Sequence, residues 1–205
     1  MNGREAEQTL SVIRTLMERS TQYRNLSGHA GIAAGAATLV GSALRFWLHT
    51  PFLLTWFAVL VAACGSATFF TAQMAQANGE PLWTRQARTV VLALTPAFLA
   101  ALILTAVLSR AGQRGLLPGV WMLMWGVGAL AMSFFTPRVL SLLGATFLVA
   151  GAAALALNIT DDALAMGATF GVIHLAYGIV LYLRQPARRG APGLPPRAEP
   201  VFPEP

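Results

Sequence analysis

Charged residues are scarce in this chain, and that scarcity limits the kinds of protein it can be. Only 11% of its 205 residues are charged, whereas 56% are hydrophobic. A soluble domain carries about 25% charged residues, so this composition indicates a surface that faces lipid. Lysine is absent, and arginine supplies all 14 basic side chains. The arginines stand at the ends of apolar runs and form no basic stripe, so no nucleic acid is expected as a partner.

Groups that carry chemistry are also scarce. Cys64 is the only cysteine, which excludes an internal disulfide and a cysteine-based metal cluster. The apolar runs contain no aspartate or glutamate, and we find neither a nucleophile–base pair nor a phosphate-binding loop. The sequence therefore predicts no enzyme activity, no bound metal and no cofactor.

Six long stretches without Asp, Glu, Lys or Arg follow one another, at 25–44, 46–79, 89–109, 115–137, 139–160 and 163–183. A helix needs about 20 apolar residues to cross roughly 30 Å of membrane hydrocarbon. The sequence therefore predicts an all-α integral membrane bundle over residues 28–183, with the lipid bilayer as its surroundings. Its six transmembrane helices are expected near 28–48, 52–73, 88–109, 117–135, 138–158 and 163–183. Three spans in each half would permit an inverted repeat, but the halves share only an abundance of Ala, Gly and Leu.

The two ends of the chain are polar. In residues 1–27 apolar side chains recur at helical spacing, which predicts an amphipathic helix on the membrane surface or against the bundle. A solvated helix with an ordinary apolar stripe would have the same pattern. Seven prolines in residues 186–205 indicate that the segment 184–205 is a disordered cytoplasmic tail. Arg184, Arg188 and Arg189 could attract anionic lipid, or they only mark the end of the last span.

The distribution of arginine predicts the orientation, because cytoplasmic segments of membrane proteins are enriched in basic residues. With the N-terminus inside, eleven arginines are cytoplasmic and three, Arg45, Arg110 and Arg114, are outside. We therefore expect both termini in the cytoplasm, at the inner membrane of a bacterium. Tryptophans form belts at membrane interfaces. Those expected in the outer belt are Trp47, Trp56, Trp121 and Trp125.

The last span contains a histidine among glycines. Gly167, Gly171, His174 and Gly178 recur at spacings of four, three and four, which places them on one face of a regular helix. Small residues at such spacing let a neighbouring backbone approach closely. A polar ring within hydrocarbon faces protein or a cavity rather than lipid. His174 is therefore expected to contact a ligand, to accept a proton or to bind haem iron. The alternative is a structural role, in which its ring is hydrogen-bonded to another helix.

Other positions could contribute to an intramembrane site with His174. Tyr177 follows it by three residues, Thr68 lies in the second span, and Pro96 should kink the third span and free a backbone carbonyl. Hydroxyl groups in helices can instead bond to their own backbone. The first span has its own face of small residues for helix packing. Its members are Gly28, Gly31 and Gly35.

Two further expectations concern the ends of the spans. His29 and His174 could hold one haem iron between two helices, although His29 lies near the inner interface and His174 lies close to mid-span.

Asp161 and Asp162 directly precede the last span, and both are expected to cap the N-terminus of its helix.

Several blocks resemble an uncharacterised family of small bacterial multi-span inner-membrane proteins. They are MERS at 17–20, LSG at 26–28, WGVGAL at 125–130 with Ser133, Thr136 and Leu143-Gly144, and FGVIHLAYGI at 170–179. The last block is the most specific, since His and Tyr at fixed spacing among glycines are not generic membrane composition. The resemblance implies fold and location rather than an activity. Family members often carry an acid a few residues after the Leu-Gly pair, where this chain has Ala145, Thr146 and Phe147. A proton-coupled role of the family is therefore not expected of this chain.

The sequence favours a non-catalytic membrane protein that acts by helix association, or as an accessory or sensor subunit. A homo-oligomer or a complex with a membrane partner would fit this role. The alternative is a small permease for a neutral or weakly polar solute, whose site would be lined by His174, Tyr177, Thr68 and Pro96. A haem or quinone binder is the third hypothesis.

Overall fold

The computed structural model describes residues 27–136 and 139–184, and in these ranges all of the regular structure is helical. Six helices are long and apolar enough to cross a membrane. This confirms the prediction of an all-helical, multi-pass membrane protein. The helix expected in residues 1–27 and the tail expected in residues 184–205 lie almost entirely outside the described ranges.

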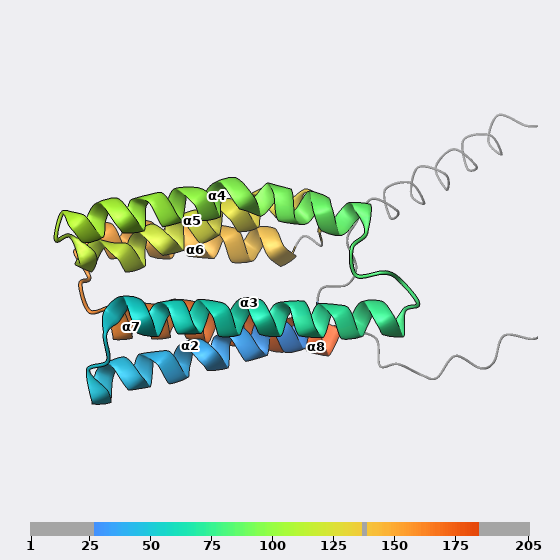
Figure 1. The fold of residues 1–205 in the computed structure, drawn as a ribbon, viewed down its shortest axis with the longest axis horizontal. Helices are drawn as coiled ribbons and strands as arrows, with labels where there is room; N and C mark the ends of the chain where they lie inside the picture. Colours follow the sequence, from blue (N-terminus) through green and yellow to red (C-terminus); the bar gives the residue numbers. More distant parts are fainter. Residues whose placement is uncertain (1–26, 137–138, 185–205) are drawn as a thin grey trace, which may run out of the picture.

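Figure 1 labels the helices of the six spans in the order of the chain. The first three are α2 (Gly28–Leu48), α3 (Phe52–Ala77) and α4 (Arg85–Arg110). A 3-10 turn, η1 (Arg114–Leu116), leads into α5 (Leu117–Ser133), which is followed by α6 (Val139–Ala156). The sixth span consists of α7 (Asp162–Met166), the π-helical turn η2 (Gly167–Gly171) and α8 (Val172–Arg184). The sequence predicts one regular helix there, so the π turn is a departure from expectation.

Local sequence signals set several helix ends. The hydroxyl of Thr84 accepts a hydrogen bond from the Ala87 N–H at 3.1 Å, which caps α4. The loop after α3 and the turn after α4 contain Gly79 and Gly112, with φ of 68° and 72°. Glycine adopts this left-handed conformation without a steric penalty. These residues therefore allow the chain to end one span and turn toward the next.

The spans form two units of three helices, which lie as two layers in Figure 1. Unit 1 contains α2, α3 and the sixth span, and unit 2 contains α4, α5 and α6. In unit 1 the central helix α2 packs against α3 and α8, and in unit 2 the central helix α5 packs against α4 and α6. The first helix of each half of the chain thus packs against the second helix of its own half and the third helix of the other half.

Glycines bring the helices of each unit into backbone contact. A Cβ atom on Gly178 would lie 2.4 Å from the backbone nitrogen of Ile32, and one on Gly126 would lie 2.9 Å from the carbonyl oxygen of Gly144. A larger residue at either position would force the two helices apart. All six glycines expected as packing residues lie where α2 meets the sixth span. They are Gly28, Gly31, Gly35, Gly167, Gly171 and Gly178.

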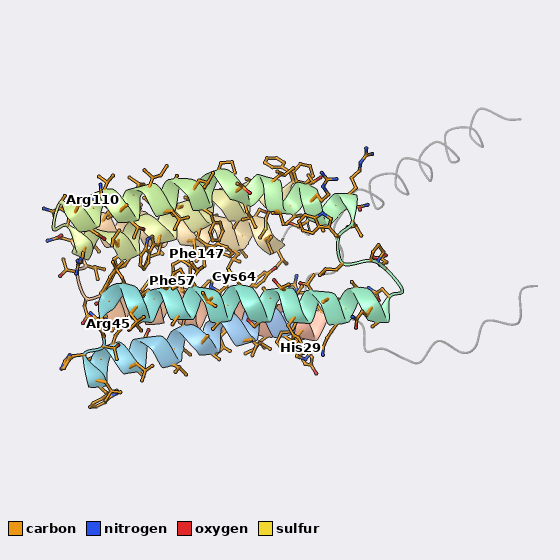
Figure 2. All side chains as sticks on the ribbon, viewed as in Figure 1. His29, Arg45, Phe57, Cys64, Arg110 and Phe147 are labelled. Carbon is orange, nitrogen blue, oxygen red and sulfur yellow. The ribbon has the colours of Figure 1, made fainter. Side chains whose placement is uncertain are left out.

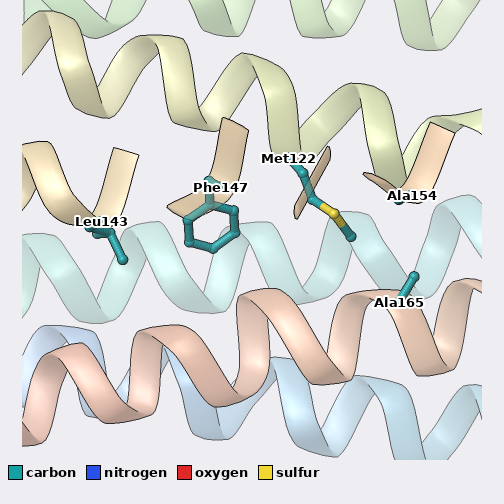
Figure 3. Packing of buried hydrophobic residues seen from close by; sticks show 5 residues of the cluster. All are labelled: Met122, Leu143, Phe147, Ala154 and Ala165. Atoms are coloured by element: carbon teal, nitrogen blue, oxygen red, sulfur yellow. The ribbon is translucent and has the colours of Figure 1, made fainter. Parts of the chain in front are cut away.

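Side chains fill the boundary between the two units. Figure 3 shows Met122, Leu143 and Phe147 of unit 2 extending toward the helix of unit 1 that carries Ala165. Phe147 is fully buried, and Figure 2 places it between the two layers. On the outside of the bundle, large apolar side chains such as Leu102 are exposed, as expected of a surface in contact with lipid.

Candidate functional site

His174 lies in α8, shortly after the π turn, and only 9% of its surface is exposed. Its Nδ1 is 3.0 Å from the carbonyl oxygen of Phe170. A carbonyl group only accepts, so Nδ1 carries a proton and donates it in this hydrogen bond. This hydrogen bond stays within the sixth span. We expected the His174 ring to bond to another helix if its role is structural, and for Nδ1 this expectation is wrong.

Aromatic rings from three elements surround the imidazole. Ring centroids lie 5.1 Å away for Phe147 of α6, 5.4 Å for Trp125 of α5 and 5.6 Å for Phe170 of η2, which is stacked at an interplanar angle of 9°. Aromatic pairs at such separations contribute about 0.5–1.5 kcal/mol each beyond the area they bury. We call His174 and these three residues the ring cluster. It lies on the boundary between units 1 and 2.

The sixth span contains a π turn, and its glycines and its imidazole contact different helices. The N–H of Val172 donates to the carbonyl of Gly167, five residues earlier, instead of to a carbonyl four residues earlier. The additional residue rotates the following helix by roughly 100° relative to a regular helix. His174 and Gly178 both follow the π turn and stay four residues apart in α8, so the turn rotates them together. The glycines contact α2, and the His174 ring contacts α5 and α6.

Of the residues expected to line a site with His174, Tyr177 lies nearest to it. Tyr177 is half-buried and packs against the apolar clusters on the boundary between the units. Thr68 is exposed on α3, and its hydroxyl donates to the carbonyl of Cys64 at 2.9 Å. Pro96 lies inside α4 and is also exposed. Thr68 and Pro96 are therefore not members of the ring cluster.

Trp125 is the member of the ring cluster that sequence reasoning assigned elsewhere. Besides His174, its ring contacts Phe98 of α4 at 6.0 Å and both Phe147 and Phe170 at 6.5 Å. The indole Nε1 is buried and has no hydrogen-bond partner among the described residues. Its position in the middle of α5, rather than at one end, is the signal that distinguishes it from a belt tryptophan.

Two hollows lie beside α7, toward the end of the bundle where the sixth span begins. One has a volume of about 330 Å³ and is lined by α2 and α7, including Ser42 and Asp161. The other has a volume of about 310 Å³, lies on the boundary between the units and is lined largely by small apolar side chains such as Ala154 and Ala165. His174 and Tyr177 line neither hollow.

A charged cluster at the start of the sixth span joins three helices. Arg45 of α2 donates from Nε and Nη2 to the two carboxylate oxygens of Asp162, each at 2.8 Å. Its Nη1 donates to the carbonyl of Thr50. Trp56 of α3 donates from its indole N–H to Oδ2 of Asp162 at 2.7 Å. We call Arg45, Trp56 and Asp162 the clasp, since one carboxylate connects α2, α3 and α7.

The clasp corrects two expectations from the sequence. Asp161 does cap α7, because its carboxylate accepts a hydrogen bond from the Leu164 N–H at 3.0 Å, but the side chain of Asp162 pairs with α2 and α3 instead. Trp56 is only 3% exposed, so it is not a lipid-facing belt residue, whereas Trp47 is 74% exposed. The signal that could have predicted the clasp is an arginine at the end of the first span and an acid pair at the same membrane face.

His29 and His174 lie in separate clusters. The ring of His29 stacks on Phe70 at 5.5 Å and meets Tyr182 edge-on at 4.9 Å. The structure therefore does not pair the two histidines as the haem hypothesis requires. Among the described residues, no group of three or more His, Cys, Asp or Glu side chains could hold a metal ion.

Comparison with known proteins found no matching family model, no similar curated protein and no similar solved structure. The resemblance to a family of small bacterial membrane proteins thus stays a prediction.

Proposed function

We propose that this chain is a non-catalytic multi-pass membrane protein that acts by associating with other membrane helices, as an accessory or sensor subunit. The observation that carries this proposal is the ring cluster. Side chains of α5, α6 and η2 pack against the buried imidazole of His174, and its Nδ1 is bonded within its own span. The most polar group at this depth therefore serves the packing of the bundle rather than the binding of a solute.

The surface best suited to association is the outward face of α3. This helix packs mainly against α2, and Ala58, Ala62 and Gly65 are exposed along it. Apart from its chain neighbours and the adjacent backbone of α3, no described atom lies within 4 Å of a Cβ built on Gly65, so the space beside it is open. Small residues allow a second transmembrane helix to approach closely. The partner would be a second copy of this chain or another membrane protein.

Site-specific photocrosslinking in native membranes tests the association. A photoreactive amino acid at Gly65 should give a discrete crosslinked protein band, because a partner helix packs there. The matched control is Leu102, which is 58% exposed on α4 and should give only lipid adducts. Mass spectrometry of the band distinguishes a second copy from a different protein. Equal, diffuse labelling at both positions would contradict the proposal.

The location and orientation belong to the same proposal. We place the protein in the inner membrane of a bacterium with both termini in the cytoplasm, since eleven of its 14 arginines would then be cytoplasmic. The amphipathic pattern of residues 1–27 would suit a helix on the membrane surface there or one that packs against the bundle. Arg184, Arg188 and Arg189 would lie beside anionic lipid headgroups.

A small permease for a neutral or weakly polar solute is the second candidate. Its support is the pairing of the helices, which is the same in both halves of the chain, together with a sixth span interrupted by a π turn. Repeats that cross the membrane in opposite directions and discontinuous helices are characteristic of secondary transporters, whose sites lie at mid-membrane between the repeats. His174 and Tyr177 would then face the solute once the boundary opened.

A further inference from the structure

We propose that units 1 and 2 are two rigid bodies that rearrange relative to each other, and that the boundary between them is the moving part. The inference goes beyond both candidate functions, because a sensor and a permease would each use such a change. It rests on the difference between the contacts within each unit and the contacts across the boundary.

Within each unit, the helices are held at their backbones. Every glycine of the α-helices and of η2 that has a close neighbour meets a helix of its own unit. In unit 1, a Cβ on Gly31 would lie 2.9 Å from the Cα of Gly178, and in unit 2 a Cβ on Gly151 would lie 2.8 Å from the backbone nitrogen of Leu123. Helices this close cannot slide without a backbone clash, since packed cores are not continuously deformable.

Hydrogen bonds between helices reinforce the same division. The clasp connects α2, α3 and α7, all of which belong to unit 1. In unit 2, the indole N–H of Trp121 in α5 donates to the hydroxyl of Thr105 in α4 at 2.8 Å. Each unit thus has glycine contacts and at least one side-chain hydrogen bond that fix its own helices.

The contacts across the boundary are of another kind. They are contacts between side chains: rings, such as Phe147 with Phe170 at 4.7 Å and Phe52 with Trp121 at 5.6 Å, and apolar side chains, such as Met122 and Ala165. Ring contacts tolerate stacked and edge-on arrangements, whereas a hydrogen bond needs its donor and acceptor aligned. The boundary also contains the hollow of about 310 Å³ and the unpaired Nε1 of Trp125. A rearrangement could fill the hollow and give this N–H a partner.

The chain crosses from one unit to the other at two places. These are residues 78–84, between α3 and α4, and residues 157–161, between α6 and α7. Both connections contain a residue with positive φ, Gly79 at 68° and Asn158 at 52°, as do the turns within the units at His49 and Gly112. Hinge motions are absorbed by a few residues in loops and at helix ends. The two crossings are therefore where the rearrangement would be accommodated.

Electron–electron spin distance measurements in lipid nanodiscs test the proposal without a ligand. The native thiol is removed by Cys64→Ala, and cysteine pairs are introduced at exposed positions for spin labelling. Gln76 with Leu183 reports on unit 1, Arg88 with Leu142 reports on unit 2, and Leu183 with Leu142 spans the boundary. We expect the pair across the boundary to give a distance distribution roughly twofold wider than either control pair, or one with two peaks.

A distribution across the boundary as narrow as those within the units would overturn the proposal. Broad distributions for the control pairs would do the same, because the units would then not be rigid. All four labelled side chains are exposed at the helix surface, so their replacement leaves the glycine contacts and the ring cluster in place.

Discussion

The imidazole of His174 and the indole of Trp125 each bring a polar N–H into the core of the bundle. His174 donates to the carbonyl of Phe170, whereas Nε1 of Trp125 has no partner in the part of the chain that the structure describes. An unpaired buried donor costs about 1–3 kcal/mol. The stacked and tilted rings around both residues offset that cost by contacts with each other. Ring packing, more than polar pairing, therefore stabilises this part of the molecule.

Two substitutions at His174 separate ring packing from hydrogen bonding. His174→Ala leaves a cavity among three rings and should lower the free energy of unfolding by about 3 kcal/mol. His174→Phe keeps the ring and loses only the bond to the Phe170 carbonyl, so a loss of about 1 kcal/mol is expected. Unfolding by denaturing detergent, followed through tryptophan fluorescence, measures both values. Equal losses for the two variants would show that the ring is not what His174 contributes.

At the level of elements, the clasp fixes the start of the sixth span against α2 and α3. Its carboxylate accepts from two nitrogens of Arg45 and from the indole of Trp56. The side chains of Arg45 and Asp162 are 20% and 14% exposed, so the pair is only partly screened by solvent. An ion pair of this kind lies between a surface pair, which contributes little, and a buried pair, whose disruption is costly.

Asp162→Asn should therefore lower the free energy of unfolding by about 2 kcal/mol, because the guanidinium of Arg45 keeps its burial and loses its countercharge. The neighbouring acid provides a matched control. Asp161→Asn should change stability by less than about 0.5 kcal/mol, since asparagine caps a helix nearly as well as aspartate. The same detergent titration measures both. A loss at Asp161 as large as that at Asp162 would mean that the capping of α7, and not the clasp, is what matters.

The sequence allowed the existence of the six helices to be predicted, because each needs only an uninterrupted apolar stretch. It did not allow the π turn to be predicted, because the sequence positions of Gly167, Gly171 and His174 are the same whether the helix there is regular or contains a π turn. It also did not reveal the clasp. Arg45 and Asp162 are far apart in the chain, and only the packing of α2 against the sixth span brings them together.

At the level of the whole molecule, the fold is defined by which helices pack against each other. Each half contributes its third helix to the unit that contains the first two helices of the other half. The halves need not resemble each other in sequence for this, because small residues at the crossing points are sufficient. Gly31 and Gly178 meet this need in unit 1, and Gly126 and Gly144 meet it in unit 2. Composition alone, rich in Ala, Gly and Leu throughout, could not reveal which glycine meets which.

The orientation of the whole bundle is the last testable consequence. Arg45 and Arg110 lie at the same end of the molecule in Figure 2, and Arg45 is neutralised by Asp162. That end thus keeps even less unpaired positive charge than a count of arginines suggests, which favours it as the outer end. Alkaline phosphatase fused after Gln113 should therefore be active, and green fluorescent protein fused after Pro205 should fluoresce. An active phosphatase after Pro205 would reverse the orientation and place the clasp at the cytoplasmic face.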